Sequence, residues 1–264
     1  GLAELREQIE RAVPLSPGRY NRKVHGTAGE KIAALEELAQ SEDVQPEEFA
    51  KNWRLQLGSL GGGNHFIEVT VDETGRVWTF LHSGSRGVGN KIAQRYIRQA
   101  KKYAEKRDPD LPDDNLAHLA VTDHHYGRYM SHLHWAQEFA RLNRELMMDR
   151  VVEQLGRFMD ADVQRAEEVN CHHNYTATET HFGTELLISR KGAIAAHAGV
   201  RGLIQGSMGA ASYVVTGLGE PMSLCSAPHG AGRTYSRRKA RQTFTQEDLR
   251  QRMAGIEYRD DAAF

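Results

Sequence analysis

Apolar residues recur at helical spacing in several parts of the chain. Leu2, Leu5 and Ile9 lie three or four residues apart, which predicts a helix that ends before Pro14. A second helix is expected after Thr27, which could cap it. The same reasoning predicts the remaining helices, at about 90–106, 126–158, 237–241 and, after Thr245, up to Met253.

Alternating or continuous apolar runs predict strands in between. The first two run over 66–71 and 77–81, around a turn at 72–75. Further strands are expected at 186–189, 193–196 and 212–215. Helices and strands are mixed along the chain without a linker or a repeat. The pattern therefore favours an α+β fold, a single mixed domain over residues 1–264, with βαβ units as the alternative.

Composition narrows the class of protein. The formal net charge is −1, so a nucleic-acid site would have to be a local basic patch. Two cysteines, Cys171 and Cys225, imply no disulfide framework. No apolar run reaches the ~18–20 residues of a membrane span, and no signal-peptide pattern opens the chain. We therefore expect a cytoplasmic protein without a membrane partner. The start at Gly1 suggests a fragment or a processed product, or only the loss of an initiator Met or a tag.

Four histidines lie in turns rich in glycine or asparagine: His65, His82, His173 and His229. Neutral imidazole is a common ligand of first-row divalent metals, and glycines let the backbone approach a ligand. The shared setting predicts one assembled metal and phosphate site, although each histidine alone could be structural. No His-x-x-x-His pair occurs among them, so their spacing is weak evidence for a metal. The other histidines lack a glycine-rich frame and are expected to be packing or surface residues.

Glycine-rich stretches are a second indication of a phosphate-binding site. Residues 206–209 and 230–232 can present successive N–H groups to an anion, and Arg233 adds a guanidinium fork. Residues 87–89 offer a third possible anion site before a helix. Plain turns are the alternative, since neither a Walker A loop nor a dinucleotide fingerprint is present. His229 beside such a turn could be a nucleophile toward phosphorus.

Basic residues cluster near the C-terminal end of the sequence. Five of them occupy nine positions from Arg233 to Arg241, with Tyr235 among them. On a helix they could follow the phosphates of a nucleic acid, or they could simply face solvent. Residues 190–192 are expected to form a basic hairpin tip with the same two interpretations.

These motifs together resemble the RtcB-type RNA-splicing ligases. The matching segments, in the family's order, are residues 57–68, 82–87, 171–175, 190–193, 206–209 and 227–233. The resemblance implies that family's own α+β fold. It also implies an enzyme that joins RNA ends bearing a 2′,3′-cyclic phosphate or 3′-phosphate to ends bearing a 5′-hydroxyl, with GTP and Mn²⁺.

Residue by residue, the resemblance makes His65, His82 and His173 the manganese ligands, and His229 the catalytic residue that takes GMP. The complete protein would hold two manganese ions. The implied nucleotide contacts are Asn64, Glu68, Asn174, Ser207, Gly230, Ala231, Gly232 and Arg233. A phosphoramidate on histidine is a high-energy link, so GMP could pass to an RNA 3′-phosphate that a 5′-hydroxyl then attacks.

The sequence departs from the family in three places. No Cys precedes Gly58, whereas family members carry an Asp and a Cys there that bridge the two metals. A C-terminal lysine of the family has no counterpart, and Gln205 stands where proline is usual. We therefore expect a catalytic-core fragment, or a split product whose partner supplies the missing ligands. Two other functions stay open at this point: a metal-dependent cyclic phosphodiesterase and an inactive RNA-binding relative.

Overall fold

The computed structural model describes residues 1–15, 19–232 and 234–260, without the side chain of Arg237. The chain divides into two units. The first, here called the helical unit, comprises residues 10–157. The second, the strand-rich unit, comprises residues 1–9 and 158–264.

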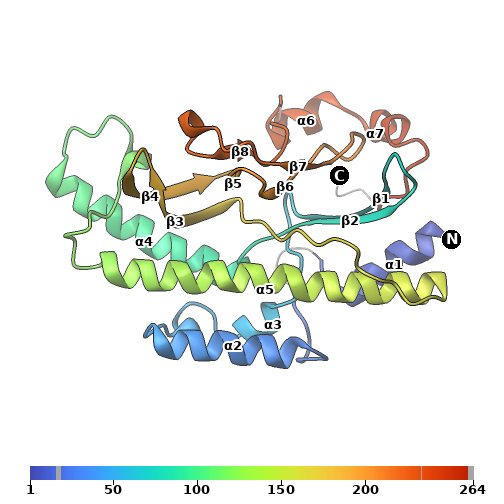
Figure 1. Cartoon of the computed structure of the whole chain (residues 1–264), viewed down its shortest axis with the longest axis horizontal. Coiled ribbons are helices and arrows are strands. Elements are labelled where there is room, and N and C mark those ends of the chain that lie inside the picture. Colours follow the sequence, from blue (N-terminus) through green and yellow to red (C-terminus); the bar gives the residue numbers. More distant parts are fainter. Residues whose placement is uncertain (16–18, 233, 261–264) are drawn as a thin grey trace. The chain divides into compact units, whose positions relative to one another are not determined.

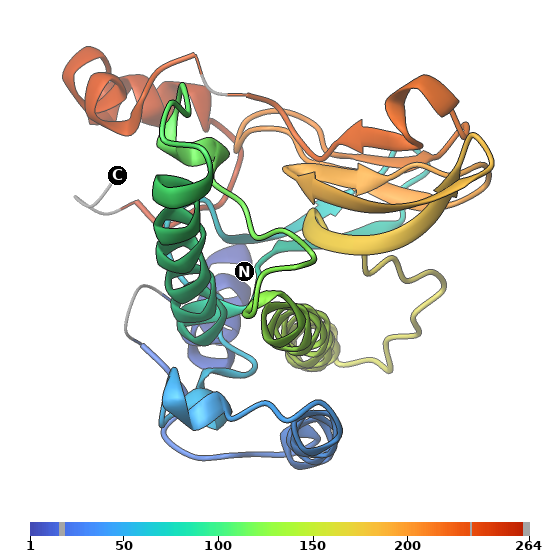
Figure 2. The ribbon, with the colours of Figure 1, turned by 90° about the vertical axis from the view of Figure 1, so that its left-hand side faces the viewer.

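The helical unit is built around one long helix. Its elements in chain order are α1 (Leu2–Ala12, which begins in the other unit), α2 (Ala28–Ser41), a 3₁₀ turn (Pro46–Glu48), α3 (Trp53–Gln56), β1 (Phe66–Val71), β2 (Val77–His82), α4 (Arg86–Arg107), a second 3₁₀ turn (Asp114–Leu116) and α5 (Tyr126–Met159). Figures 1 and 2 show α2 running beside α5. Trp53, Trp135 and Phe139 are almost fully buried in the core between these helices. Burial of such large aromatic side chains contributes strongly to the stability of a core.

The strand-rich unit contains three two-stranded antiparallel sheets. Its elements are β3 (Asn174–His181), β4 (Thr184–Lys191), β5 (Ala193–Ala195), β6 (Arg201–Ile204), β7 (Tyr213–Thr216), a 3₁₀ turn (Pro221–Ser223), β8 (Ser226–Pro228), α6 (Arg237–Thr243) and α7 (Gln246–Arg252). The pairs are β3 with β4, β5 with β8, and β6 with β7. The pairing of β5 with β8 joins two segments far apart in the sequence, with Ala193 opposite Pro228.

The helix and strand predictions are largely confirmed. The strand at 66–71 has its predicted bounds, and the helices at 2–12, 28–41 and 126–159 agree to within a few residues. Thr245 caps α7 in a reciprocal capping box with Asp248, as expected. Thr27 stands at the N-cap of α2 but makes no side-chain capping bond, so its predicted cap is wrong. The α+β class is confirmed, while the prediction of one domain over residues 1–264 stays a prediction.

Three strands escaped prediction: β3, β6 and β8. The sequence of β3 is Asn-Tyr-Thr-Ala-Thr-Glu-Thr-His, in which polar residues on both faces hide the usual alternation. The strand β8 has only three residues and ends in proline. Its pairing with β5 comes from tertiary contacts that no local pattern reveals.

The helix predicted from about residue 90 begins earlier, at Arg86. Gly87 and Gly89 in its first turn are poor helix formers and concealed the start. Val88 is fully buried, and its N–H donates to the side chain of Gln56 at 3.0 Å, which anchors this turn. The described part of the chain contains no helix that combines the length and the apolar composition of a membrane span.

Candidate functional site

Two of the predicted metal ligands form a pair in the helical unit. His65 immediately precedes β1, and His82 ends β2, opposite Phe66 in the register. The ring centroids of His65 and His82 lie 5.7 Å apart. His82 is buried and stacks on Phe66 at 6.0 Å. The hairpin therefore brings together two imidazoles that the sequence separates by seventeen positions.

A buried asparagine on α5 fastens the two turns that carry this pair. The Oδ1 atom of Asn143 accepts from the N–H of Gly58 at 2.7 Å. Its Nδ2 donates to the carbonyls of Ser59 and Gly84, at 3.3 and 3.2 Å. Ser83 Oγ completes the link by donating to the carbonyl of Leu60 at 2.8 Å. Asn143 is fully buried, and nothing in its helical sequence context marked it as a support of the site.

Arg86 lies against the glycine run that precedes His65. Gly61 has a positive φ of 97°, and a Cβ there would meet the guanidinium of Arg86 at 1.9 Å. The same guanidinium donates to Ser59 Oγ at 2.9 Å. Burial lowers the pKa of His65 and the nearby Arg86 cation lowers it further. The imidazole is therefore held in the neutral form, which is the form that binds a metal.

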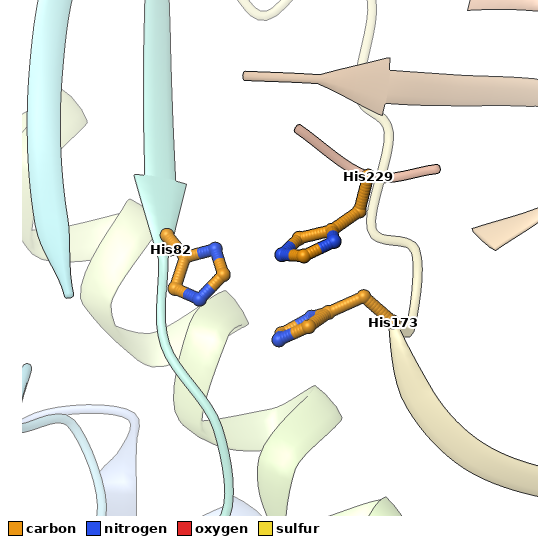
Figure 3. Close-up of side chains that lie close together, drawn as sticks. All are labelled: His82, His173 and His229. Atoms are coloured by element: carbon orange, nitrogen blue, oxygen red, sulfur yellow. The ribbon is translucent and has the colours of Figure 1, made fainter. Parts of the chain in front are cut away.

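The other two predicted histidines pair in the strand-rich unit. His173 immediately precedes β3, and His229 immediately follows β8. Their rings lie face to face, as Figure 3 shows. The ring centroids are 4.7 Å apart and the planes differ by 14°. A ligand nitrogen of one lies within 4.8 Å of a ligand nitrogen of the other. The predicted GMP acceptor thus lies face to face with a predicted metal ligand.

A backbone carbonyl sets the tautomer of the neutral His229 ring. Its Nδ1 lies 2.7 Å from the carbonyl oxygen of Gly192. A carbonyl only accepts, so Nδ1 carries the proton, and the lone pair of the neutral ring is on Nε2. On the other side of the same glycine, the Gly192 N–H donates to Asn174 Oδ1 at 2.9 Å. Asn174, expected from the resemblance to contact the nucleotide, therefore also anchors the residue whose carbonyl orients His229.

The two glycine-rich loops lie next to each other. Gln205 and Gly230 form a parallel bridge, in which Gln205 N–H donates to the carbonyl of His229 at 3.0 Å. The bridge brings the loop of Ser207, which is exposed, beside the loop of His229. The N–H of Ala231 donates to the Gln205 carbonyl at 3.2 Å, so this donor is already used within the fold.

Two predictions from the sequence are wrong. Residues 87–89 do not precede a helix but form the first turn of α4, and the N–H groups of Val88 and Gly89 are already bonded to the Gln56 side chain and the Ser85 carbonyl. Residues 190–192 are no hairpin tip, because β4 pairs with β3 and not with β5. Arg190 lies within β4 and is buried, so it is not a surface cation that could follow phosphates.

The remaining predicted contacts have mixed outcomes. Asn64 is exposed beside His65, and Glu68 lies half-buried in β1. Gly230 is half-buried next to His229, and Gly232 is exposed. Arg233 falls outside the described residues.

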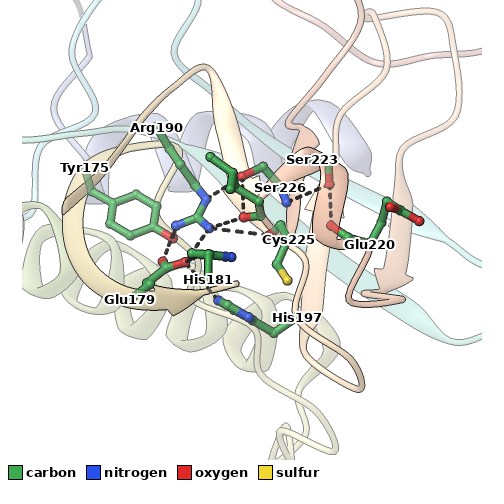
Figure 4. Close-up of polar contacts among 10 residues, drawn as sticks. Tyr175, Glu179, His181, Arg190, His197, Glu220, Ser223, Cys225 and Ser226 are labelled. Carbon is green, nitrogen blue, oxygen red and sulfur yellow. Dashed lines mark hydrogen bonds and ion pairs between the residues drawn. The ribbon is translucent and has the colours of Figure 1, made fainter. Parts of the chain in front are cut away.

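Arg190 belongs to a polar cluster that the sequence did not indicate (Figure 4). Its guanidinium forms a bidentate ion pair with Glu179 on β3, one arm of it at 2.9 Å. His181 and His197 also contact this carboxylate, at 2.8 and 3.3 Å. The hydrogen bonds from Arg190 lower the pKa of Glu179 to about 2, with a smaller contribution from His181. Neither histidine has a glycine-rich frame, so no local signal pointed to them.

Arg190 also links this cluster to the segment that leads to His229. It donates to Ser226 Oγ at 2.9 Å and to the carbonyl of Leu224 at 3.0 Å. Both groups lie in or just before β8, whose next residue is His229. These hydrogen bonds from Arg190 therefore tie the end of β4 to the strand that immediately precedes the predicted nucleophile.

Comparison with known proteins agrees with this arrangement of motifs. The sequence model of the family described as tRNA-splicing ligase RtcB matches residues 2–264. The chain belongs to the RtcB family. Membership confirms the resemblance drawn from the motifs and, with it, the predicted enzyme class of RNA ligase.

Similar proteins occur in bacteria and archaea. The RNA-splicing ligase RtcB1 of Escherichia coli ATCC 25922 is 43% identical over 99% of this chain and 67% of its own length. The RNA-splicing ligase RtcB of E. coli K12 is 42% identical over the same shares. The tRNA-splicing ligase RtcB of Pyrobaculum aerophilum is 28% identical over 96% of this chain and 65% of its own length. The chain thus spans about two thirds of the length of these relatives.

Proposed function

We propose that this RtcB-family protein joins an RNA end bearing a 2′,3′-cyclic phosphate or 3′-phosphate to an end bearing a 5′-hydroxyl, with GTP and Mn²⁺, through a histidine–GMP intermediate. One observation carries the proposal. His229 has its Nδ1 proton directed to the Gly192 carbonyl, and its ring stacks on His173. A neutral imidazole oriented in this way has one nitrogen, Nε2, with a lone pair for nucleophilic attack.

The first step is guanylylation of His229. Nε2 attacks the α-phosphorus of GTP, a P–N bond forms, and the bond to the leaving pyrophosphate breaks. The ring becomes positively charged as it attacks, and the Nδ1–H···O contact to Gly192 strengthens because the donor is then cationic. The carbonyl therefore stabilises the charge that develops in this step.

His65, His82 and His173 are the residues that would hold manganese. Each stands at a strand end, and the low pKa of His65 keeps that ligand neutral and ready to bind. The metal, when bound, neutralises charge on the phosphoryl oxygens during transfer. The choice of manganese over other first-row metals comes from the family resemblance. Convergence of these three imidazoles on one ion, and a second ion in the complete protein, stay predictions.

Two further steps complete the join. A 3′-phosphate oxygen of the RNA attacks the phosphorus of the histidine-linked GMP, so the P–N bond breaks and His229 is regenerated. The 5′-hydroxyl of the second RNA then attacks the activated 3′-phosphate, and GMP leaves. A 2′,3′-cyclic end must first be opened by water to a 3′-phosphate. Asn64, Glu68, Asn174, Ser207 and the loop of Gly230 are proposed to contact the guanine nucleotide.

Mass spectrometry of the peptide that contains Pro228 and His229 tests the proposal. After incubation of the complete protein with GTP and Mn²⁺, we expect an acid-labile GMP on His229. His229→Ala should abolish both the adduct and GTP-dependent joining, yet spare RNA that already carries GMP on its 3′-phosphate. His25→Ala is the matched control, because His25 is exposed and lies in the helical unit.

An adduct on another residue, or none in the complete protein, would refute the role of His229. Opening of cyclic phosphates without any adduct would instead identify a cyclic phosphodiesterase, and RNA binding without either reaction an inactive relative. A cytoplasmic location and the need for a partner segment that supplies further ligands stay predictions from the sequence.

A further inference from the structure

The helix α4 is strongly basic in a protein of net charge −1. Its 22 residues contain eight lysines and arginines and one acidic residue, Glu105. The imbalance is local, as a nucleic-acid site must be in this protein. Figure 2 shows α4 as the teal to green helix.

Four of these basic residues form one stripe along α4: Lys91, Arg98, Lys102 and Lys106. At 3.6 residues per turn they fall within an arc of about 80°. The stripe runs for about 22 Å along the helix axis, at about 1.5 Å per residue. All four side chains are exposed. A straight row of cations at this spacing matches an extended polyanion better than a single small anion.

The other cations of α4 have partners, whereas the stripe has no ionic partner among the described residues. Arg95 is paired with Glu48 at 2.9 Å, Lys101 with Asp114 at 3.3 Å and Arg107 with Asp123 at 3.1 Å. Within the described part of the chain, no carboxylate forms an ion pair with Lys91, Arg98, Lys102 or Lys106. Four adjacent cations repel one another, which leaves this face ready to gain from a polyanionic ligand.

We propose that this stripe binds the sugar-phosphate backbone of the RNA strand. The inference rests on the proposed function, and it names a surface that the catalytic residues do not include. The helix begins four residues after His82, so the stripe starts near a predicted metal ligand and leads away from it along α4. RNA held there would have its end near His82 and its chain along the helix. Contacts to phosphate carry no base preference, so this surface would hold RNA independently of its sequence.

An anionic membrane surface is the other partner that a basic helix could bind. Membrane-surface helices insert an exposed apolar face below the lipid head groups. The apolar face of α4 is already occupied, since Val88, Ile92 and Tyr96 belong to the core of the helical unit. The charge pattern without an available apolar face therefore favours RNA.

The test compares two variants with the same change in charge. The first replaces Lys91, Arg98, Lys102 and Lys106 with Ala. The control replaces four exposed cations elsewhere in the helical unit, Lys23, Lys51, Arg76 and Arg157, with Ala. Binding of a short single-stranded RNA with a 3′-phosphate is measured between about 50 and 200 mM salt, without GTP. Circular dichroism establishes that both variants fold, as alanine at exposed helix positions should allow.

We expect the stripe variant to lower the slope of log Kd against log salt by up to about 2.8, at about 0.7 for each lost phosphate contact. The control should change the slope by far less. Equal slopes in the two variants would overturn the proposal. So would loss of binding to phosphatidylserine vesicles by the stripe variant with an unchanged RNA slope.

A second readout separates this proposal from the proposed function. GMP attachment to His229 needs no RNA, so the stripe variant should form the adduct at the wild-type rate. If the wild-type protein forms no adduct but the stripe variant still lowers the salt slope, the ligase mechanism is refuted and the RNA-binding surface is supported. If the adduct forms normally and the stripe and control variants have equal slopes, the RNA-binding surface is refuted and the mechanism is supported.

Discussion

Nδ1 of His229 lies 2.7 Å from the carbonyl oxygen of Gly192, at the junction of β4 and β5. Because a carbonyl cannot donate, this contact sets the tautomer of the ring and leaves the lone pair on Nε2. Gly192 is itself held by Asn174, whose Oδ1 accepts the Gly192 N–H at 2.9 Å. The orientation of His229 thus depends on Asn174, which follows His173 and lies 55 positions before His229 in the chain.

Replacing Asn174 should slow attachment of GMP to His229. Asn174→Ala removes the acceptor for the Gly192 N–H, at a cost of about 1 kcal/mol for a lost hydrogen bond. If that loss loosens the ring in the transition state, the rate at saturating GTP should fall about five- to tenfold. Single-turnover formation of the adduct measures this rate.

Asn174→Asp distinguishes positioning from nucleotide contact. The aspartate keeps an oxygen that can accept from Gly192, but it loses the amide donor that a nucleotide contact would use. Recovery of the rate at saturating GTP, with a raised KM for GTP, would assign both roles to Asn174. An equal rate loss in the Asp and Ala variants would contradict the positioning role.

Much of the site could be predicted from the sequence, because the residues next to its histidines are themselves informative. Glycine or asparagine next to His65, His82, His173 and His229 marked all four. The supports could not be predicted in the same way. In the sequence, Asn143 is one polar position on a long helix. Its contacts to residues 58–59 and 84 form only because these residues, some 60–85 positions earlier in the chain, pack against the helix. Supporting residues act through tertiary distance, which periodicity does not encode.

The wrong predictions have a similar cause. Arg190 was expected at the surface because residues 190–192 were predicted to form a basic hairpin tip between two strands. The strand β4 pairs with the polar strand β3, and this pairing buries Arg190 against Glu179. A charged residue is rarely buried without a partner, but its partner lies eleven positions away on a strand that the pattern did not reveal.

Gly61→Ala should be strongly destabilising. The residue has a φ of 97°, and an added Cβ would lie 1.9 Å from Arg86 Nη1 and 2.7 Å from His65 Nδ1. Strained backbone and overpacking each cost about 1–3 kcal/mol, so we expect a loss of about 3 kcal/mol in the free energy of unfolding. Urea unfolding measures this change.

Gly75→Ala is the matched control. Its φ is similar, at 84°, but a Cβ there would meet nothing within 4 Å. Only the cost of the left-handed backbone conformation remains, so the free energy of unfolding should fall by about 1 kcal/mol. A loss of the same size in both variants would show that the approach of Arg86 to the glycine run adds nothing to stability.

Glu179→Gln should remove part of the pH dependence of stability. The pKa of Glu179 is lowered from 4.5 to about 2, chiefly by its hydrogen bonds from Arg190. Between these values the unfolded state binds the proton and the folded state does not, so stability falls as the pH falls through this window. Above pH 4.5 the contribution of Glu179 is fully present. The variant leaves buried Arg190 without its carboxylate and should lose about 3 kcal/mol near neutral pH.

Urea unfolding at about pH 6 and about pH 3 measures the effect, because the deficit of the variant relative to wild type should shrink at the lower pH. Glu185→Gln is the control: Glu185 lies in the same sheet on β4 and is exposed, so its replacement should leave the pH dependence unchanged. A deficit of Glu179→Gln that is constant from pH 6 to pH 3 would mean that the Arg190 pair does not hold the carboxylate ionised.

The same variant also tests the link to the nucleophile, since Arg190 holds the segment before β8. Slower GMP attachment to His229 in a variant that is still folded at pH 7 would show that the ion pair positions His229 as well as stabilising the unit.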